Sequence, residues 1–194
     1  MRRAALIVAF AAAAAFTPSP ARADFEGNVN FFLGEKSLDS NDWKPLDSQF
    51  EFGAVMSFGQ SDWPVQIAGD VLVSVDETDV QGITFTGTTF EFDAGIRWLI
   101  LKKGKVFPYL GGGVGLIGAG LKGDFGVGDV DAADVALGVW ADTGVFFRLG
   151  SHFNIGLDLR YSSADVDLDF GSGFVAQNVN AGGFSYGLLV GFGW

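Results

Sequence analysis

Cysteine is absent from this sequence, histidine occurs once, and basic residues are scarce. The absence of cysteine excludes a disulfide framework, so an exported domain of this sequence must be held by hydrogen-bonded strands and by closure of its sheet. Lysine and arginine number 12 against 23 aspartate and glutamate residues. The sequence therefore lacks the clustered basic residues that nucleic-acid binding needs, and we expect no nucleic-acid partner.

Long apolar runs are also missing after the first 23 residues, where no stretch reaches the roughly 18 apolar residues of a membrane-spanning helix. The first 23 residues follow another pattern. Arg2 and Arg3 precede an uncharged apolar run over residues 4–16, and Ala21-Arg22-Ala23 offers small residues for cleavage. This order is typical of a secretory signal peptide. We predict a cleaved signal peptide over residues 1–23 and a single domain over residues 24–194.

The apolar residues that are present, 48% of the chain, alternate with small or polar ones. The end of the chain shows this most clearly, because large side chains occupy every second position there. Successive side chains of a strand point to opposite faces, so these large side chains share one face. A soluble protein rarely exposes such a face at a chain end, whereas lipid would cover it. The face comprises Tyr186, Leu188, Val190, Phe192 and Trp194.

The same alternation divides the rest of the domain into segments of about ten residues, the length of a tilted membrane-spanning strand. Short connections alternate with longer, acidic ones, as expected for short periplasmic turns and long extracellular loops. We predict an all-β fold, an eight-stranded antiparallel up-and-down transmembrane β-barrel. Its strands would cover residues 25–33, 50–58, 65–75, 90–98, 106–116, 135–149, 153–161 and the segment from about 182, and its long loops residues 34–48, 76–88, 122–134 and 163–180.

The inward faces of these strands carry both acidic and basic residues. Eight strands leave an interior just wide enough for side chains, and buried charges are tolerated only when they are paired. We therefore predict a polar network that fills the lumen in place of a water channel. Its members would be Glu51, Asp70, Glu91, Asp93, Arg97, Asp142, Arg148, Asp158 and Arg160.

Aromatic residues stand near the predicted strand ends, where the two membrane interfaces would lie. Trp98, Tyr109 and Trp194 would form the periplasmic girdle, and Tyr161 would belong to the opposite one. In the glycine-rich fifth strand the parity is hard to follow, and Leu110, Val114 and Leu116 are assigned to the lipid side.

The chain resembles the small eight-stranded outer-membrane barrels, such as the transmembrane domain of OmpA and the OmpX-like class. The resemblance is carried by Ala21-Arg22-Ala23, by the strand Pro108-Tyr-Leu-Gly-Gly-Gly-Val-Gly115 and by the ending Gly187-Leu-Leu-Val-Gly-Phe-Gly-Trp194. It implies location in the outer membrane of a Gram-negative cell envelope. It also implies that the last strand is the signal recognised by the outer-membrane assembly machinery. Because barrels of this class serve as anchors, adhesins, enzymes and pores, the resemblance does not define a function.

Three local patterns suggest chemistry and are better explained by structure. Ser151 and His152 are adjacent, so their side chains would point apart, and they fall in a periplasmic turn. The G-x-G-x-x-G motif at residues 113–118 is not followed by a helix, so a dinucleotide site is not expected. Asp165, Asp167 and Asp169 share a strand face but lack the glycine of a calcium loop, which leaves them as weak metal candidates on a solvated hairpin. We expect no cofactor and no metal.

The sequence thus predicts a non-enzymatic outer-membrane barrel with a structural or surface-interaction role and with lipid as its surroundings. The extracellular ligand stays open. Alternatives are a narrow pore or transporter for small solutes, a lipid-A-modifying enzyme, and a soluble lipocalin-like barrel, which would need polar residues outside and an apolar lumen.

Overall fold

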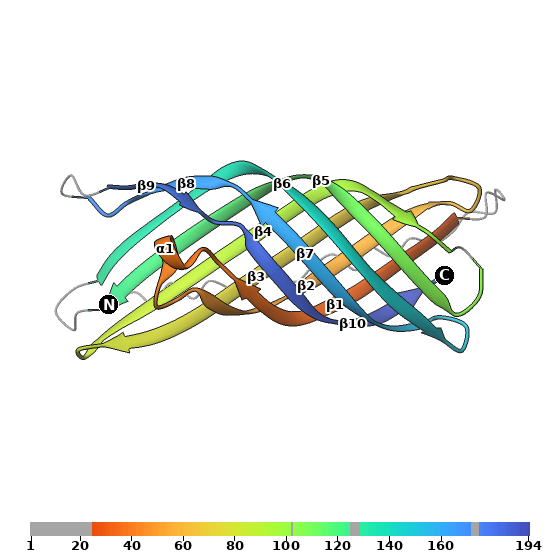
Figure 1. Ribbon diagram of the computed structural model, residues 1–194, viewed down its shortest axis with the longest axis horizontal. Coiled ribbons are helices and arrows are strands. Elements are labelled where there is room, and N and C mark those ends of the chain that lie inside the picture. The colour runs from red at the N-terminus through yellow and green to blue at the C-terminus, as the bar shows by residue number, and fades with distance from the viewer. Residues whose placement is uncertain (1–24, 102, 125–128, 172–174) are drawn as a thin grey trace, which may run out of the picture.

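The protein is a closed barrel of eight strands, with one short helix and one two-stranded hairpin at one end (Figure 1). The computed structural model describes residues 25–101, 103–124, 129–171 and 175–194. The signal peptide predicted over residues 1–23 lies outside this range. The elements are β1 (Phe25–Ser37), α1 (Ser40–Trp43), β2 (Ser48–Gln60), β3 (Gln66–Val80), β4 (Ile83–Leu99), β5 (Val106–Asp124), β6 (Asp129–Leu149), β7 (Phe153–Ser163), β8 (Asp165–Asp169), β9 (Val175–Asn180) and β10 (Gly183–Gly193).

Every strand of the barrel pairs antiparallel with its neighbours in the chain, and β1 closes the ring by pairing with β10. Closure continues to the chain end, since the backbone N–H groups of Gly27 and Trp194 donate to each other's carbonyl oxygens at 3.2 and 3.0 Å. The predicted fold class is therefore confirmed. A closed ring leaves no free sheet edge, which is the arrangement that an apolar solvent requires.

The strands are longer than the sequence predicts, and most of the additional residues lie at the end that carries the long connections. In barrels of this kind that end is extracellular, and we use the term extracellular end for it. The loop predicted over residues 76–88 is wrong, because β3 and β4 continue as a ladder to the turn at Gln81 and Gly82. Both turn residues have positive φ, 54° and 82°. The threonine-rich sequence after the turn favours a strand, because β-branched residues suit the extended backbone.

The loop predicted over residues 163–180 is likewise a structured element, the hairpin β8–β9. It lies beside α1 at the extracellular end, away from the short turns and the C-terminus (Figure 1). α1 is a single turn in which the Asp39 carboxylate caps the N-terminus by accepting from the backbone N–H of Asn41 at 2.9 Å.

The outer surface of the barrel is apolar. Large hydrophobic side chains stay exposed at alternate positions of the eight barrel strands, and Leu110, Val114 and Leu116 of β5 face outward as predicted. This polarity is the reverse of a soluble lipocalin-like barrel and suits a lipid bilayer. Among the described residues, no helix is long and apolar enough to cross a membrane.

The interior differs from the uniformly polar lumen that the sequence suggests. In β10, Leu189 lies in one apolar cluster and Ser185 is a buried polar residue. Ala181, which precedes β10, belongs to a second apolar cluster nearer the extracellular end. Phe32 and Lys36 of β1 and Leu38, just after this strand, repeat this order. A buried polar layer therefore lies between two apolar clusters. The periplasmic cluster is Phe32, Val55, Leu72, Leu99, Phe107, Tyr109, Phe146 and Leu189. The extracellular cluster is Leu38, Trp43, Ile117, Ala119, Ala132, Ala164, Val166, Leu168, Val179 and Ala181.

Candidate functional site

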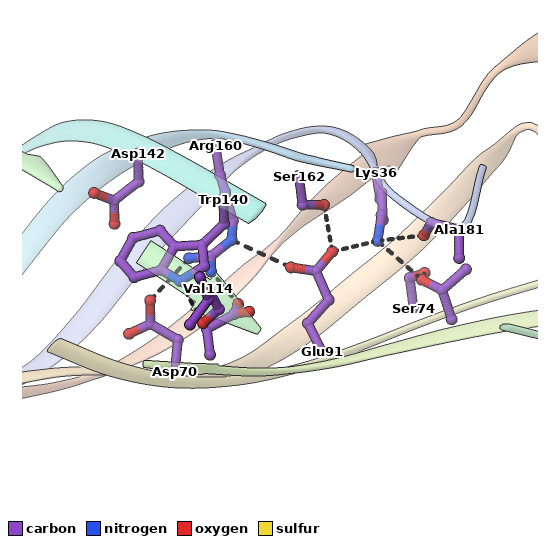
Figure 2. Close-up of polar contacts among 12 residues, drawn as sticks. Lys36, Asp70, Ser74, Glu91, Val114, Trp140, Asp142, Arg160, Ser162 and Ala181 are labelled. Atoms are coloured by element: carbon purple, nitrogen blue, oxygen red, sulfur yellow. Dashed lines mark hydrogen bonds and ion pairs between the residues drawn. The ribbon is translucent and has the colours of Figure 1, made fainter. Parts of the chain in front are cut away.

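Arg160 of β7 is the centre of the buried polar layer. Its side chain is 1% exposed and pairs with three carboxylates from β3 and β4 across the lumen. Nη1 lies 2.8 Å from the Asp70 carboxylate and Nε lies 3.4 Å from that of Glu91, while Nη2 donates to Asp93. The guanidinium carbon lies 4.5 Å from the centroid of the Trp140 ring. Figure 2 shows Arg160 beside Trp140, with Glu91 and Asp70 on its other sides. One side chain thus ties β3, β4, β6 and β7 together.

Arg97 of β4 forms the second ionic contact and shares a carboxylate with Arg160. Its Nη2 lies 3.0 Å from Asp70 Oδ2, the oxygen that Arg160 also contacts, and it donates to Asp142. Nη1 donates to the Met56 carbonyl oxygen at 3.1 Å. The shared carboxylate of Asp70 joins Arg97 and Arg160 into one network, in which each guanidinium group has at least two carboxylate partners.

A third group lies on the extracellular side of this network and contains a cation that the sequence analysis missed. Lys36 Nζ donates to Glu91 at 2.6 Å, to Thr89 at 3.1 Å and to the Ala181 carbonyl at 3.2 Å. Ser162 also donates to Glu91, at 2.6 Å (Figure 2). The sequence predicts that the first strand ends at residue 33, which places Lys36 in a loop. The alternation of inward polar positions after Asn28 and Asn30 would have found it.

Three residues predicted for the network take other positions. Arg148 lies near the short-turn end, where it donates to Asn28 at 2.5 Å and to Asn154 at 3.1 Å, apart from the carboxylates. Asp158 accepts from the hydroxyl of Tyr109. Glu51 is 1% exposed, yet neither of its carboxylate oxygens has a hydrogen-bond partner among the described residues.

Tyr109 is a correction to the predicted girdle. It is 1% exposed and points into the lumen, where its hydroxyl reaches Asp158. Its position depends on Gly144, the residue opposite it in β6, where a Cβ atom would come within 2.4 Å of the Tyr109 hydroxyl oxygen. The other three residues of the predicted girdle, Trp98, Tyr161 and Trp194, are about half exposed on the outer surface.

Glycine also makes room for Trp140, the ring against which Arg160 stacks. A Cβ atom on Gly95 would lie 2.8 Å from the Trp140 ring and 2.3 Å from the Gly112 carbonyl oxygen. The Trp140 Nε1 donates to the Val114 carbonyl at 3.2 Å. The glycine-rich strands therefore have a packing role, because they let a large ring lie flat inside a narrow barrel.

The last strand presents one face to the outside. The residues of the predicted assembly signal are all exposed on the barrel surface, namely Tyr186, Leu188, Val190, Phe192 and Trp194. The pair Ser151 and His152 occupies the turn between β6 and β7, at the end opposite the hairpin β8–β9.

The extracellular end is acidic. Asp165, Asp167 and Asp169 lie exposed on one face of β8, while Val166 and Leu168 on its other face pack into the extracellular cluster. Asp167 is already used structurally, since it accepts from the backbone N–H of Asn178 at 2.9 Å. Among the described residues, no group of three histidine, cysteine or acidic side chains is arranged to hold a metal ion.

Two carboxylates of this end are hydrogen-bonded and favour the ionised form. The backbone N–H of Asp167 donates to Asp134 at 2.9 Å and lowers the pKa of that carboxyl, and so docks β8 on β6. The Ser40 hydroxyl lowers the pKa of Asp47, and the charge of Lys44 adds to the effect. These two carboxylates therefore add negative charge to the extracellular end.

No protein-family model and no curated protein matches this sequence. The structure, however, matches solved bacterial outer-membrane proteins. Neisserial surface protein A is 20% identical with a TM-score of 0.51, over 86% of this chain and 96% of that one. Ail, the attachment invasion locus protein of Yersinia pestis, in a complex with the heparin analogue sucrose octasulfate, is 14% identical with a TM-score of 0.61, over 88% and 99%. With its apolar exterior and its eight-stranded ring, this chain has the fold of the small eight-stranded outer-membrane β-barrels.

Proposed function

We propose that the chain is a non-enzymatic protein of the bacterial outer membrane that holds a rigid acidic platform at the cell surface for a basic partner. One observation carries the proposal: the ionic layer around Arg160 and Arg97 fills the lumen. A side-chain-filled barrel is a poor pore, so its useful surface is the extracellular end. The last strand would serve as the signal for the outer-membrane assembly machinery.

The charge of that end supports a basic partner. Among its described residues, Lys44 and Lys122 are the exposed basic ones, since Lys36 is buried, and many exposed carboxylates surround them. Complementary charge steers association and weakens as salt rises. Ail was crystallised with an anionic heparin analogue. The acidic end of this chain would repel such a ligand, so the likeness in fold is not extended to the ligand. The exposed carboxylates are Asp39, Asp42, Glu77, Asp79, Asp131, Asp165, Asp167 and Asp169.

Two measurements test this proposal. In planar bilayers, the purified protein should give no discrete channel steps, and conductance steps would refute the sealed lumen. On cells that display the protein, a fluorescent nona-arginine peptide should bind, release as salt rises, and bind less to the variant Glu77→Gln, Asp131→Asn, Asp165→Asn. The control variant Glu26→Gln, Asp62→Asn removes charges at the opposite end and should bind normally. Equal binding by both variants, binding of sucrose octasulfate, or a changed lipid A mass would contradict the proposal.

A further inference from the structure

A cavity of about 370 Å³ opens at the extracellular end, between α1, the β3–β4 hairpin and the β8–β9 hairpin. Its volume falls in the range of small-molecule sites, about 300–1,000 Å³. The lining is apolar except for two charged residues, Asp42 and Lys44. The proposed acidic platform does not need an apolar cavity. The cavity therefore points to a separate role.

The walls of the cavity are held in place by buried side chains. Trp43 is 4% exposed, and its Nε1 donates to the Asn180 carbonyl oxygen at 2.8 Å, which fastens α1 to the end of β9. Leu168 and Val179 also line the cavity. Both belong to the extracellular cluster, with exposed fractions of 3% and 8%. A site with walls already packed loses little conformational entropy when it takes a ligand.

The cavity has a closed floor. Leu121 lines it, and the next inward residues along β5, Ala119 and Ile117, are fully buried. Below them lies the ionic contact of Lys36 with Glu91. An apolar molecule that entered the cavity would have to break this buried charge pair to travel further. The geometry is that of a binding site and not of a passage.

The charges around the opening restrict the ligand further. Lys44 lies near Asp47, and its positive charge helps to lower the pKa of the Asp47 carboxyl. The negative charge of Asp47 in turn offsets the charge of Lys44. Asp42 accepts from the backbone N–H of Asn180 at 3.1 Å, and Asp39 caps α1 beside it. An anionic amphiphile would meet mostly negative charge here. We infer that this cavity binds a small, uncharged apolar molecule taken from the external medium.

The inference can be tested with a pair of dyes that share one aromatic framework. N-phenyl-1-naphthylamine is neutral, and 8-anilinonaphthalene-1-sulfonate carries a negative charge. Methyl-labelled protein in nanodiscs of deuterated lipid reports the site directly. The neutral dye should give saturable shifts at the methyl groups of Leu168, Ala176 and Val179, whereas lipid-facing Leu137 and Leu157 should change only linearly through partitioning. The anionic dye should bind at least about tenfold more weakly.

A matched pair of variants separates the cavity from non-specific binding. Ala176→Phe fills the cavity and should weaken the saturable shift, read at Val179, by at least about tenfold. Ala133→Phe adds the same ring on the exposed face of β6 and should leave binding unchanged. Both variants should keep heat-modifiable gel migration, the mark of a closed barrel. Unchanged binding by Ala176→Phe, or equal binding of both dyes, would overturn the inference. So would contacts between lipid chains and the cavity methyls without dye. None of these results depends on whether a basic peptide binds.

Discussion

Replacement of Arg160 by methionine tests the ionic layer most directly. The substitution keeps an unbranched apolar stem of similar length and removes the guanidinium group, which contacts Asp70, Glu91 and Asp93. Two of these carboxylates keep another cation, because Asp70 also pairs with Arg97 and Glu91 with Lys36. Asp93 depends most on Arg160. The change therefore leaves about one buried carboxylate uncompensated.

The expected loss of stability follows from that count. Removing one partner of a buried ion pair costs about 3–5 kcal/mol, because the remaining charge stays out of water. Arg148→Met is the matched control, since Arg148 contacts the neutral side chains of Asn28 and Asn154 and lies partly exposed. Its loss removes two hydrogen bonds and leaves no charge uncompensated, so it should cost about 2 kcal/mol, at about 1 kcal/mol for each bond. The double variant Arg160→Met, Asp93→Asn should recover part of the difference, because the uncompensated charge is gone.

The assay is reversible unfolding in urea with the protein in lipid vesicles, followed by tryptophan fluorescence and by heat-modifiable migration on gels. The free energies of unfolding of the three variants are compared with that of the wild type. Two results would contradict this prediction. One is a loss in the free energy of unfolding for Arg160→Met that is no larger than that for Arg148→Met. The other is a further loss, and not a recovery, when Asp93→Asn is added to Arg160→Met.

Two further predictions concern buried polar and small residues. Glu51→Gln should stabilise the barrel by about 1–3 kcal/mol in the same urea assay, because a buried carboxylate without a hydrogen-bond partner becomes an uncharged amide; destabilisation would show that the charge itself is needed. Gly95→Ala should lower the free energy of unfolding by about 1–3 kcal/mol, since the new Cβ would collide with the Trp140 ring and with a backbone carbonyl. Gly69→Ala, where the nearest atom is 3.8 Å away, should change it little, and equal effects of the two alanines would contradict this packing argument.

The sequence predicts the barrel well because lipid outside and side chains inside impose a strict two-residue period. Leu157 and Leu159 alternate with Asp158 and Arg160, and one such strand establishes both faces. The prediction weakens where that contrast disappears. At residues 117–121 the inward face is apolar as well, because Ile117 and Ala119 belong to the extracellular cluster and Leu121 packs against it, so the two faces no longer contrast in polarity. At residues 83–89 threonine occurs on both faces, and the alternation is again weak.

The site was harder to predict because it depends on partners far apart in the sequence. Tyr109 was assigned to the surface since tyrosine is common at membrane interfaces, whereas its inward position is permitted by Gly144 across the ladder. Lys36 lies beyond the predicted strand end, yet it pairs with Glu91. The extracellular cluster is formed by segments whose composition is typical of loops. No local sequence pattern predicts that these segments pack together.

The pairing of β1 with β10 has a consequence for how the protein is made. β1 pairs with β10, the last strand of the barrel, so the ring cannot close before that strand has been synthesised. Until residues 183–193 have arrived, both outer strands offer unpaired backbone groups to any other extended chain, which invites aggregation. Contacts between such distant residues also form slowly. Closure of the ring by β10 is therefore the step that removes both exposed edges.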